Sequence, residues 1–167
     1  LFESQLDNLV QSVCYIDCGI RGSERRNYQN LDDSRIRGAE VSMTGQVLNN
    51  LSLSINYTFL DSEDTQTGLP LEDRPQYMTR INFNWTPFDS TEVTWRSEFN
   101  GKQFVGNDEY VPSYHLHHLD ISVDLGEHLT LYTGIENLFD ERLSDESDLF
   151  TLYEPGREFR LGFTARL

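Results

Sequence analysis

Three arginines gather in one polar segment near the start of the chain. Arg21, Arg25 and Arg26 lie within residues 14–27, whereas the other long polar segments are rich in aspartate and glutamate. Guanidinium groups carry paired N–H donors that suit the oxygen atoms of an anionic metal chelate. The cluster is therefore a candidate ligand-binding site, although an exposed charged loop without a ligand would have the same composition.

Both cysteines of the chain, Cys14 and Cys18, fall in the same segment. An even pair of cysteines in a loop predicts a disulfide where the medium is oxidising. A zinc site would need further ligands, and the neighbouring sequence supplies no histidine and no other cysteine. We expect a structural disulfide that stiffens the loop, and no metal site there.

A second segment holds three histidines, His115, His117 and His118. Three imidazoles suggest a haem or metal site. In an extended chain, however, His115 and His117 point to one face and His118 points to the other. We therefore predict structural roles and no bound cofactor, with one imidazole available to a ligand at the polar face. The acidic segments also lack the twelve-residue ligand pattern of a calcium loop.

Alternating apolar and polar residues define the elements that must position these side chains. The pattern occupies 159–167, up to the chain end, and recurs at 51–59, 77–85, 93–99, 119–125 and 129–135. Successive side chains of a β-strand point to opposite faces, so each segment predicts a strand with one apolar face. Weaker strands before Val13 and across 35–47 bring the total to about eight, an even count that suits an antiparallel meander.

The connections between these strands alternate in length. Tight turns are predicted at 48–50, 87–90 and 126–128, and the longer polar segments are 14–27, 61–73, 102–112 and 138–154. Short turns at one end and long loops at the other are typical of an outer-membrane barrel, whose turns face the periplasm. Most strands are also near the 9 to 11 residues that a tilted strand needs to cross a bilayer.

Aromatic and charged side chains fit the same arrangement. Trp85 and Trp95 flank one tight turn, while Tyr57, Phe59 and Tyr77 lie toward the opposite strand ends, as two aromatic belts would, although aromatic residues are common in any strand. Unpaired charge in a wall is costly, so we expect ion pairs among the charged residues of the polar faces. These are Arg80, Arg96, Glu98, Asp120, Asp124, Glu136, Arg160 and Arg166.

Composition excludes several other classes of protein. No window approaches the roughly eighteen consecutive apolar residues of a membrane helix. The net charge of -15 argues against nucleic-acid binding, which needs a basic surface. The sequence has no nucleophile elbow, phosphate-binding glycine loop or helical zinc signature, so we predict no enzyme. No signal peptide opens the chain, and its start is expected to be internal to a strand.

Three segments carry a family resemblance. NLDDSRIRGAE at 30–40, GIENLFD at 134–140 and YEPGREFRLGFTARL at 153–167 together resemble the C-terminal barrel of TonB-dependent outer-membrane receptors. The resemblance implies an all-β fold in which residues 1–167 supply about eight consecutive strands of a plugged, 22-stranded barrel. The N-terminal plug and the earlier strands are absent from this sequence.

The same resemblance implies a location, a function and a set of partners. Such a receptor lies in the outer membrane of a Gram-negative bacterium and imports a ferric siderophore or similar chelate, energised through TonB. A catecholate siderophore would suit the arginine cluster. The partners are the lipid bilayer, the plug and earlier strands, the TonB complex, the ferric chelate and the barrel-assembly machinery. That machinery would read a final strand formed by Phe159, Leu161, Phe163, Ala165 and Leu167, where the family usually ends in Phe.

Two other architectures remain open from the residues. A stand-alone eight-stranded barrel could act as an adhesin or a structural protein, but small closed barrels fill their interior with side chains. The polar faces here are mostly Ser, Thr, Asn and Gly, which favours the wall of a wider lumen. A soluble β-sandwich or lipocalin-like barrel would instead gather the apolar residues into one dry centre, including Leu53, Ile81, Trp95, Ile121 and Phe163.

Overall fold

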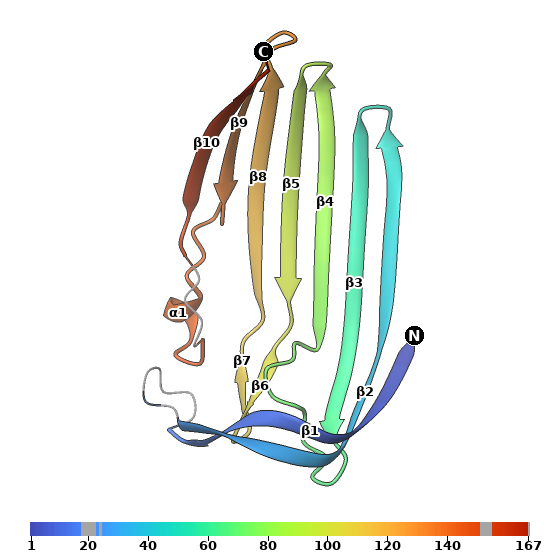
Figure 1. The fold of residues 1–167 in the computed structure, drawn as a ribbon, viewed down its shortest axis with the longest axis vertical. Coiled ribbons are helices and arrows are strands. Elements are labelled where there is room, and N and C mark those ends of the chain that lie inside the picture. Colours follow the sequence, from blue (N-terminus) through green and yellow to red (C-terminus); the bar gives the residue numbers. More distant parts are fainter. Residues whose placement is uncertain (18–22, 24, 151–154, 167) are drawn as a thin grey trace.

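A single antiparallel sheet forms most of the molecule. The computed structural model describes residues 1–17, 23, 25–150 and 155–166, apart from the side chain of Asp32. Eight strands follow one another in the order β1-β2-β3-β4-β5-β8-β9-β10 (Figure 1). Their bounds are β1 Phe2–Ile16, β2 Arg25–Leu48, β3 Leu51–Asp64, β4 Tyr77–Phe88, β5 Thr91–Asn100, β8 Tyr114–Asp124, β9 Leu129–Glu136 and β10 Glu158–Ala165.

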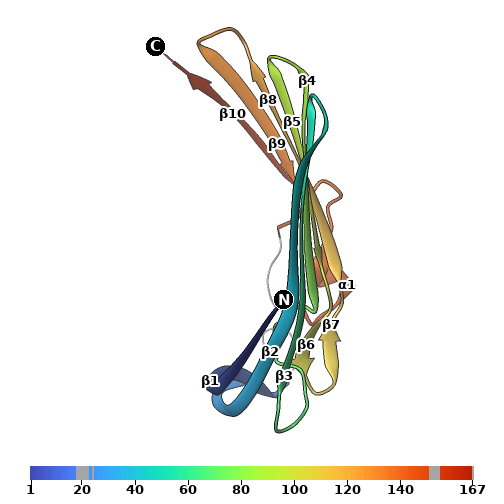
Figure 2. The ribbon, with the colours of Figure 1, turned by 90° about the vertical axis from the view of Figure 1, so that its right-hand side faces the viewer.

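The sheet is an open, curved wall. Among the described residues β1 pairs only with β2, and β10 pairs only with β9. Seen edge-on, the strands bend toward one concave side and the two edges do not meet (Figure 2). A closed eight-stranded barrel is therefore not what this chain forms, and the alternative of a stand-alone small barrel is not supported. An open sheet edge cannot stay unpaired in lipid.

An unbroken row of apolar residues crosses one face of the wall. Cross-strand pairing aligns one residue from each of six neighbouring strands in a single row: Leu53, Phe83, Trp95, Leu119, Ile135 and Phe159. These side chains face outward, since Phe83 is 39% exposed and Phe159 is 73% exposed. The buried cluster of the molecule contains none of them. The apolar residues do not form a shared dry centre, so the soluble alternative is wrong and a membrane-facing wall is confirmed.

The two ends of the wall differ as predicted. Tight turns join β2 to β3, β4 to β5 and β8 to β9 at one end, and the long segments lie at the other (Figure 1). The long segments contain more structure than expected. Residues 102–112, predicted to be a loop, include the hairpin of β6 (Gln103–Gly106) and β7 (Glu109–Val111), and the last long segment contains the short helix α1 (Leu143–Glu146).

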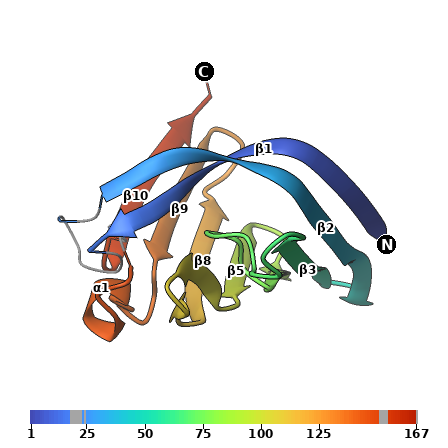
Figure 3. The ribbon, with the colours of Figure 1, turned by 90° about the horizontal axis from the view of Figure 1, so that it is seen from below.

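The first hairpin is also longer than predicted. Strand β2 begins at Arg25, ten positions before the expected strand, because its polar first half pairs with β1 from Arg25 to Gly38. That half has no apolar alternation, so the residue pattern could not predict it. Viewed from the long-loop end, the β1–β2 hairpin passes in front of β9 and β10, clear of the lower ends of β5 and β8 (Figure 3).

A small core holds the long segments together. Val105 and Val111 of the β6–β7 hairpin pack against Leu143 of α1 and against Phe150. All four are nearly inaccessible to solvent, and their contacts join two segments that flank β8 and β9. Apolar burial therefore fixes the loops on one another at the outer end. No helix among the described residues is long and apolar enough to cross a membrane.

Candidate ligand-binding site at the long-loop end

A row of arginines on β2 faces carboxylates of β3. Arg35 lies opposite Glu63 and Arg37 opposite Asp61 in the strand register. The ion pairs measure 2.6 Å from Nη2 of Arg35 to Oε1 of Glu63 and 2.7 Å from Nη2 of Arg37 to Oδ2 of Asp61. Each pair is partly exposed and contributes at most about 1 kcal/mol. Their main effect is to neutralise the two carboxylates where β3 leaves the wall.

Arg26 connects the first hairpin to the segment that follows β3. Its Nη2 atom lies 2.7 Å from Oε2 of Glu72 and 3.0 Å from Oδ2 of Asp73, and its Nε donates to Oγ of Ser12. The Glu72 side chain is only 5% exposed. A buried carboxylate that loses its partner is strongly destabilised. Arg26 therefore has a structural role at the loop junction.

The predicted arginine site is only partly described. Arg25 is exposed at the start of β2, Arg26 is ion-paired, and Arg21 lies outside the described residues. The three side chains thus stay a predicted ligand site. Cys14 is buried at the end of β1, but Cys18 also lies outside the described residues, so the disulfide stays a prediction.

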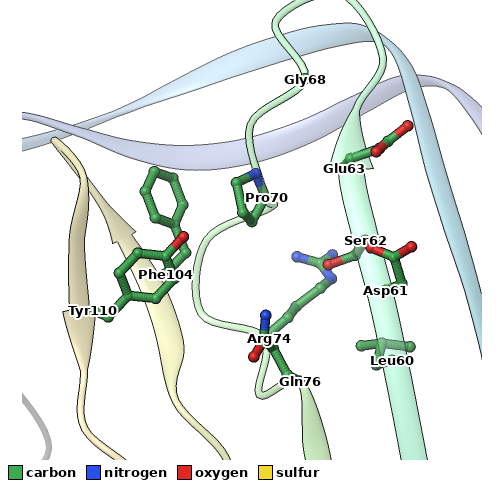
Figure 4. A pocket seen from close by; sticks show the side chains of 10 residues that line it. All are labelled: Leu60, Asp61, Ser62, Glu63, Gly68, Pro70, Arg74, Gln76, Phe104 and Tyr110. Carbon is green, nitrogen blue, oxygen red and sulfur yellow. The ribbon is translucent and has the colours of Figure 1, made fainter.

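A pocket opens between β3, the segment that follows it, and the β6–β7 hairpin (Figure 4). The segment first runs back along β3, with Leu71 N–H donating to Ser62 O at 3.1 Å and Leu60 N–H donating to Gln76 O at 2.8 Å. Between these two bonds the chain bulges away and leaves a cavity of about 120 Å³. Its lining residues are Leu60, Asp61, Ser62, Glu63, Gly68, Pro70, Arg74, Gln76, Phe104 and Tyr110.

The pocket has an aromatic side and a cationic side. Phe104 and Tyr110 are cross-strand partners in the β6–β7 hairpin, with ring centroids 5.4 Å apart. Lys102 places its Nζ 4.7 Å from the Tyr110 ring centroid, within the range of a cation–π contact. On the other side Arg74 extends its guanidinium toward Ser62 (Figure 4). Sequence analysis missed all four residues, because they belong to separate segments.

Asn137 organises the last long segment. Its side-chain amide donates to Glu141 O at 2.8 Å and Pro155 O at 3.2 Å, and its Oδ1 accepts from Glu141 N–H at 2.9 Å. The residue is buried and has a φ of 50°, a conformation that asparagine tolerates better than most residues. Asn137 therefore links the two ends of the segment.

Asp140 fixes the entry into β10. Its Oδ1 accepts the backbone N–H of Arg157 at 2.7 Å. This hydrogen bond lowers the pKa of the Asp140 carboxyl below its ordinary value, and the nearby charge of Arg142 acts in the same direction. The carboxylate thus stabilises the segment in its ionised form.

A charged network occupies the polar face of the wall, as predicted. Arg96 on β5 reaches Oδ2 of Asp120 at 3.1 Å and Oε1 of Glu136 at 2.8 Å. Arg160 on β10 pairs with the same two carboxylates, and its Nη2 lies 3.0 Å from Oδ1 of Asp120. His118 also contacts Glu136. The network joins four strands with matched charges, two arginines against two carboxylates.

Three other charged residues of the predicted set also find partners. Arg80 approaches Glu98 across β4 and β5, with 3.9 Å between Nε and Oε1. Asp124 accepts a hydrogen bond from Oγ1 of Thr130 at 2.6 Å.

The three histidines separate as alternation predicted. His118 joins the charged network, whereas His115 and His117 lie on the apolar side beside Phe99, with ring centroids 6.1 Å and 5.7 Å from it. Nδ1 of His117 is 2.8 Å from Oγ of Ser97, which accepts a hydrogen bond from the Trp95 indole. Among the described residues no group of His, Cys, Asp and Glu has the geometry of a metal site.

The final strand presents its apolar side chains outward. Phe159, Leu161 and Phe163 are 73%, 85% and 67% exposed on β10, which is an edge strand. Leu167 lies outside the described residues. The role of these residues as an assembly signal stays a prediction.

The sequence matches a known protein family over residues 1–138, described as TonB dependent receptor-like, beta-barrel. Among curated relatives, the ferric enterobactin receptor of Pseudomonas aeruginosa is 28% identical over 163 residues, covering 83% of this chain. The iron-regulated outer membrane virulence protein of Vibrio cholerae is 25% identical over 142 residues, covering 80% of this chain. The chain spans only 22% of the length of either relative.

Solved structures share the same wall. The ferric enterobactin receptor PfeA in complex with BCV-L6 has a TM-score of 0.76 at 22% identity, and the match covers 98% of this chain and 28% of that one. The copper transporter OprC gives the same TM-score at 16% identity, covering 98% of this chain and 27% of that one. At these identities the similarity establishes the fold alone. The same wall occurs in a ferric enterobactin receptor and in a copper transporter, so its shape does not identify the cargo.

Family, fold and location now agree. The family match covers most of the chain, the relatives are outer-membrane proteins of Gram-negative bacteria, and the open wall has the outward apolar face of a membrane barrel. The family is one of receptors and transporters. The chain belongs to the TonB-dependent receptor family, as part of its outer-membrane β-barrel.

Proposed function

We propose that the protein containing this chain is an outer-membrane receptor that imports a ferric siderophore or similar metal chelate with energy supplied through TonB. The observation that carries this proposal is the match, over four-fifths of the chain, to a ferric enterobactin receptor and to an iron-regulated outer membrane virulence protein. The open wall supports it, because its two unpaired edges require further strands to close a barrel.

In this proposal residues 1–167 form the C-terminal segment of the barrel. The rest of the receptor supplies the earlier strands, which close the barrel against β1 and β10, and a plug that fills the lumen. The charge network around Glu136 leaves this part of the wall electrically balanced toward the lumen. The TonB complex acts through the plug, and the barrel-assembly machinery recognises the strand that carries Phe159 and Phe163.

The ligand site lies among the long loops, which face the exterior. Arg21, Arg25 and Arg26 form its first proposed part, as cations that attract an anionic chelate. The structure shows that Arg26 also holds Glu72, so the cluster has to be tested in two pieces. Loss of Arg21 and Arg25 together leaves this ion pair intact, whereas loss of Arg26 alone removes it.

The decisive experiment is iron uptake by a receptor-deficient strain that carries the full-length gene. We expect radiolabelled iron to enter from at least one ferric siderophore, and entry to stop when the TonB-coupling segment is deleted. Labelled copper complexes serve as the parallel arm, because a copper transporter shares this wall. Uptake from no ferric chelate, with the receptor present in the outer membrane, would overturn the proposal.

The arginine cluster is tested in the same strain. The double variant R21A/R25A is expected to lower the rate of uptake at limiting chelate by roughly tenfold, the effect of losing a charge-assisted contact. R26A should also lower uptake, and it should make the loops sensitive to protease because it removes the ion pair with Glu72. Unchanged uptake in R21A/R25A would remove these two residues from the ligand site.

A further inference from the structure

We propose that the imported solute passes along one half of the polar face of the wall, over six uncharged residues of the neighbouring strands β2, β3 and β4 (Figure 1). We name this set the uncharged lane, and its members are Thr44, Gln46, Ser52, Ser54, Asn82 and Asn84. The inference rests on the proposed function, because it locates the route of the chelate within the receptor.

The first argument is that the polar face changes character between β4 and β8. Strand pairing aligns the lane in two rows across β2, β3 and β4: Thr44, Ser54 and Asn82, then Gln46, Ser52 and Asn84. The first row continues to Arg96 on β5, and the second continues through Thr94 to Asp120 on β8. Each row is therefore uncharged on β2, β3 and β4, and its charges begin on β5 or β8.

The second argument is that the charged half of this face is held by its own ion pairs. Arg96 and Arg160 both bind the carboxylates of Asp120 and Glu136. Such charge-assisted contacts are roughly twice as strong as neutral hydrogen bonds. A passing anion would have to displace an arginine from two carboxylates, so we expect the charged half to stay fixed during transport.

The third argument is the weakness of the contacts within the lane. Oγ1 of Thr44 donates to Oγ of Ser54 at 3.3 Å, and Oδ1 of Asn84 accepts from Oγ1 of Thr94 at 3.0 Å. Neutral hydrogen bonds of this kind exchange readily with water or with a polar solute. A surface that conducts a solute must also release it, and small hydroxyl and amide groups meet this condition.

The fourth argument is a cavity that continues the lane to the short-turn end. It has a volume of about 580 Å³, and Gln46, Ser52 and Asn84 of the lane line it. The other lining residues are Asn49, Asn50, Thr86, Asp89 and Glu92. The two carboxylates lie at the β4–β5 turn and repel an anion, so an anionic chelate would not be retained there.

A cation marks the opposite end of the lane. Toward the long loops, the next polar-face residue of β4 after Asn82 is Arg80, whose side chain is 69% exposed and lies 3.9 Å from Glu98. On β2 the charge that follows in this direction is Glu40, two residues beyond Ser42. An exposed guanidinium at this end would attract an anionic chelate toward the lane.

The test uses two cysteine variants of the full-length receptor in the receptor-deficient strain. S54C places a thiol in the lane, and S122C places one on the same face beside Asp120. Ser54 and Ser122 are both half-buried. The folded receptors are treated with benzyl methanethiosulfonate, and mass spectrometry measures the modified fraction. The probe is ferric enterobactin carrying radioactive iron, and other ferric siderophores replace it if the wild type does not import it.

We expect the benzyl group on S54C to abolish uptake while binding of the chelate to chilled cells is unchanged. S122C, whether or not it reacts, and the treated wild type should import iron as the untreated wild type does. The lane is overturned if modified S54C transports normally, if S54C does not react, or if modification of S122C also stops uptake.

Uptake by the wild type separates this inference from the proposed function. A wild type that imports a ferric siderophore, together with modified S54C that imports it equally well, overturns the lane alone. A wild type that imports no ferric siderophore overturns the proposed function and the lane with it.

Discussion

The spanning wall and the long-loop end of this molecule are stabilised in opposite ways. The wall repeats one device, in which every strand pairs with its neighbours and alternates apolar and polar side chains. The loops depend on a few singular contacts, such as the Arg26–Glu72 pair, the Asn137 amide and the core around Phe150. The stability of the sheet is distributed over many similar contacts, whereas the stability of the long-loop end depends on each of a few contacts. Substitutions should therefore have different consequences in the two regions.

The largest effect is expected where a charge enters the apolar face. Phe83 lies near the middle of β4 in the outward row, so F83R should destabilise the folded barrel by about 2–4 kcal/mol, the cost of arginine near the bilayer midplane. The readout is the fraction of receptor that resists unfolding in detergent before heating. N84R is the matched control. Asn84 is the next residue of β4 and lies on the opposite, polar face, so this variant should fold normally. Equal behaviour of the two variants would contradict the assignment of the faces.

Loss of one loop amide should matter more than loss of one wall amide. N137A leaves three backbone partners without their hydrogen bonds, and we expect a cost of about 2 kcal/mol, confined to the last long segment. Limited proteolysis within residues 138–157 measures it. N56A removes a single exposed bond from Ser42 in the wall and should leave the cleavage pattern unchanged. Equal cleavage of both variants would remove the distinction between the regions.

Within the wall, the charged network around Asp120 and Glu136 is the part that depends on a few specific contacts. A methyl group at Gly134 would collide with the Asp120 carboxylate and crowd Arg160, so G134A should cost about 1 kcal/mol by overpacking. Thermal unfolding of the purified receptor provides the measurement. G45A is the control, because nothing lies within 4 Å of the added carbon there. A G134A variant as stable as G45A would show that the network tolerates displacement.

The smallest effect is expected for the pH dependence of the Asp140 contact at the entry into β10. Because the folded state lowers the pKa of Asp140, its stabilising effect is complete at neutral pH and is lost as the pH falls from the ordinary pKa of an aspartate down through the lowered pKa of the folded state. Proteolysis of the last segment by an acid-active protease should therefore increase over that range in the wild type. D140N should be cleaved readily at every pH, and D148N should behave as the wild type does. A flat pH profile in the wild type would contradict this role.

Much of the wall could be predicted from sequence, and little of the loop site could. Alternation identified the faces of His115, His117 and His118 correctly, because the direction of a side chain depends only on its position within a strand. The β6–β7 hairpin was missed because its strands of four and three residues are too short for a periodic signal. Arg74 had no motif around it, and its partners in the pocket come from other segments.

The amino-acid order by itself determined the strands that span the wall, their two faces and the alternation of short and long connections, since each follows from residues that are near neighbours in the chain. Only the tertiary structure decided which charges meet and where a pocket opens. Arg26 and Glu72 are 46 positions apart in the chain. Phe104 lies beside β3 because the β6–β7 hairpin is held in place by the packing of Val105 and Val111. Such contacts depend on the packing of distant segments, for which the local pattern of residues provides no rule.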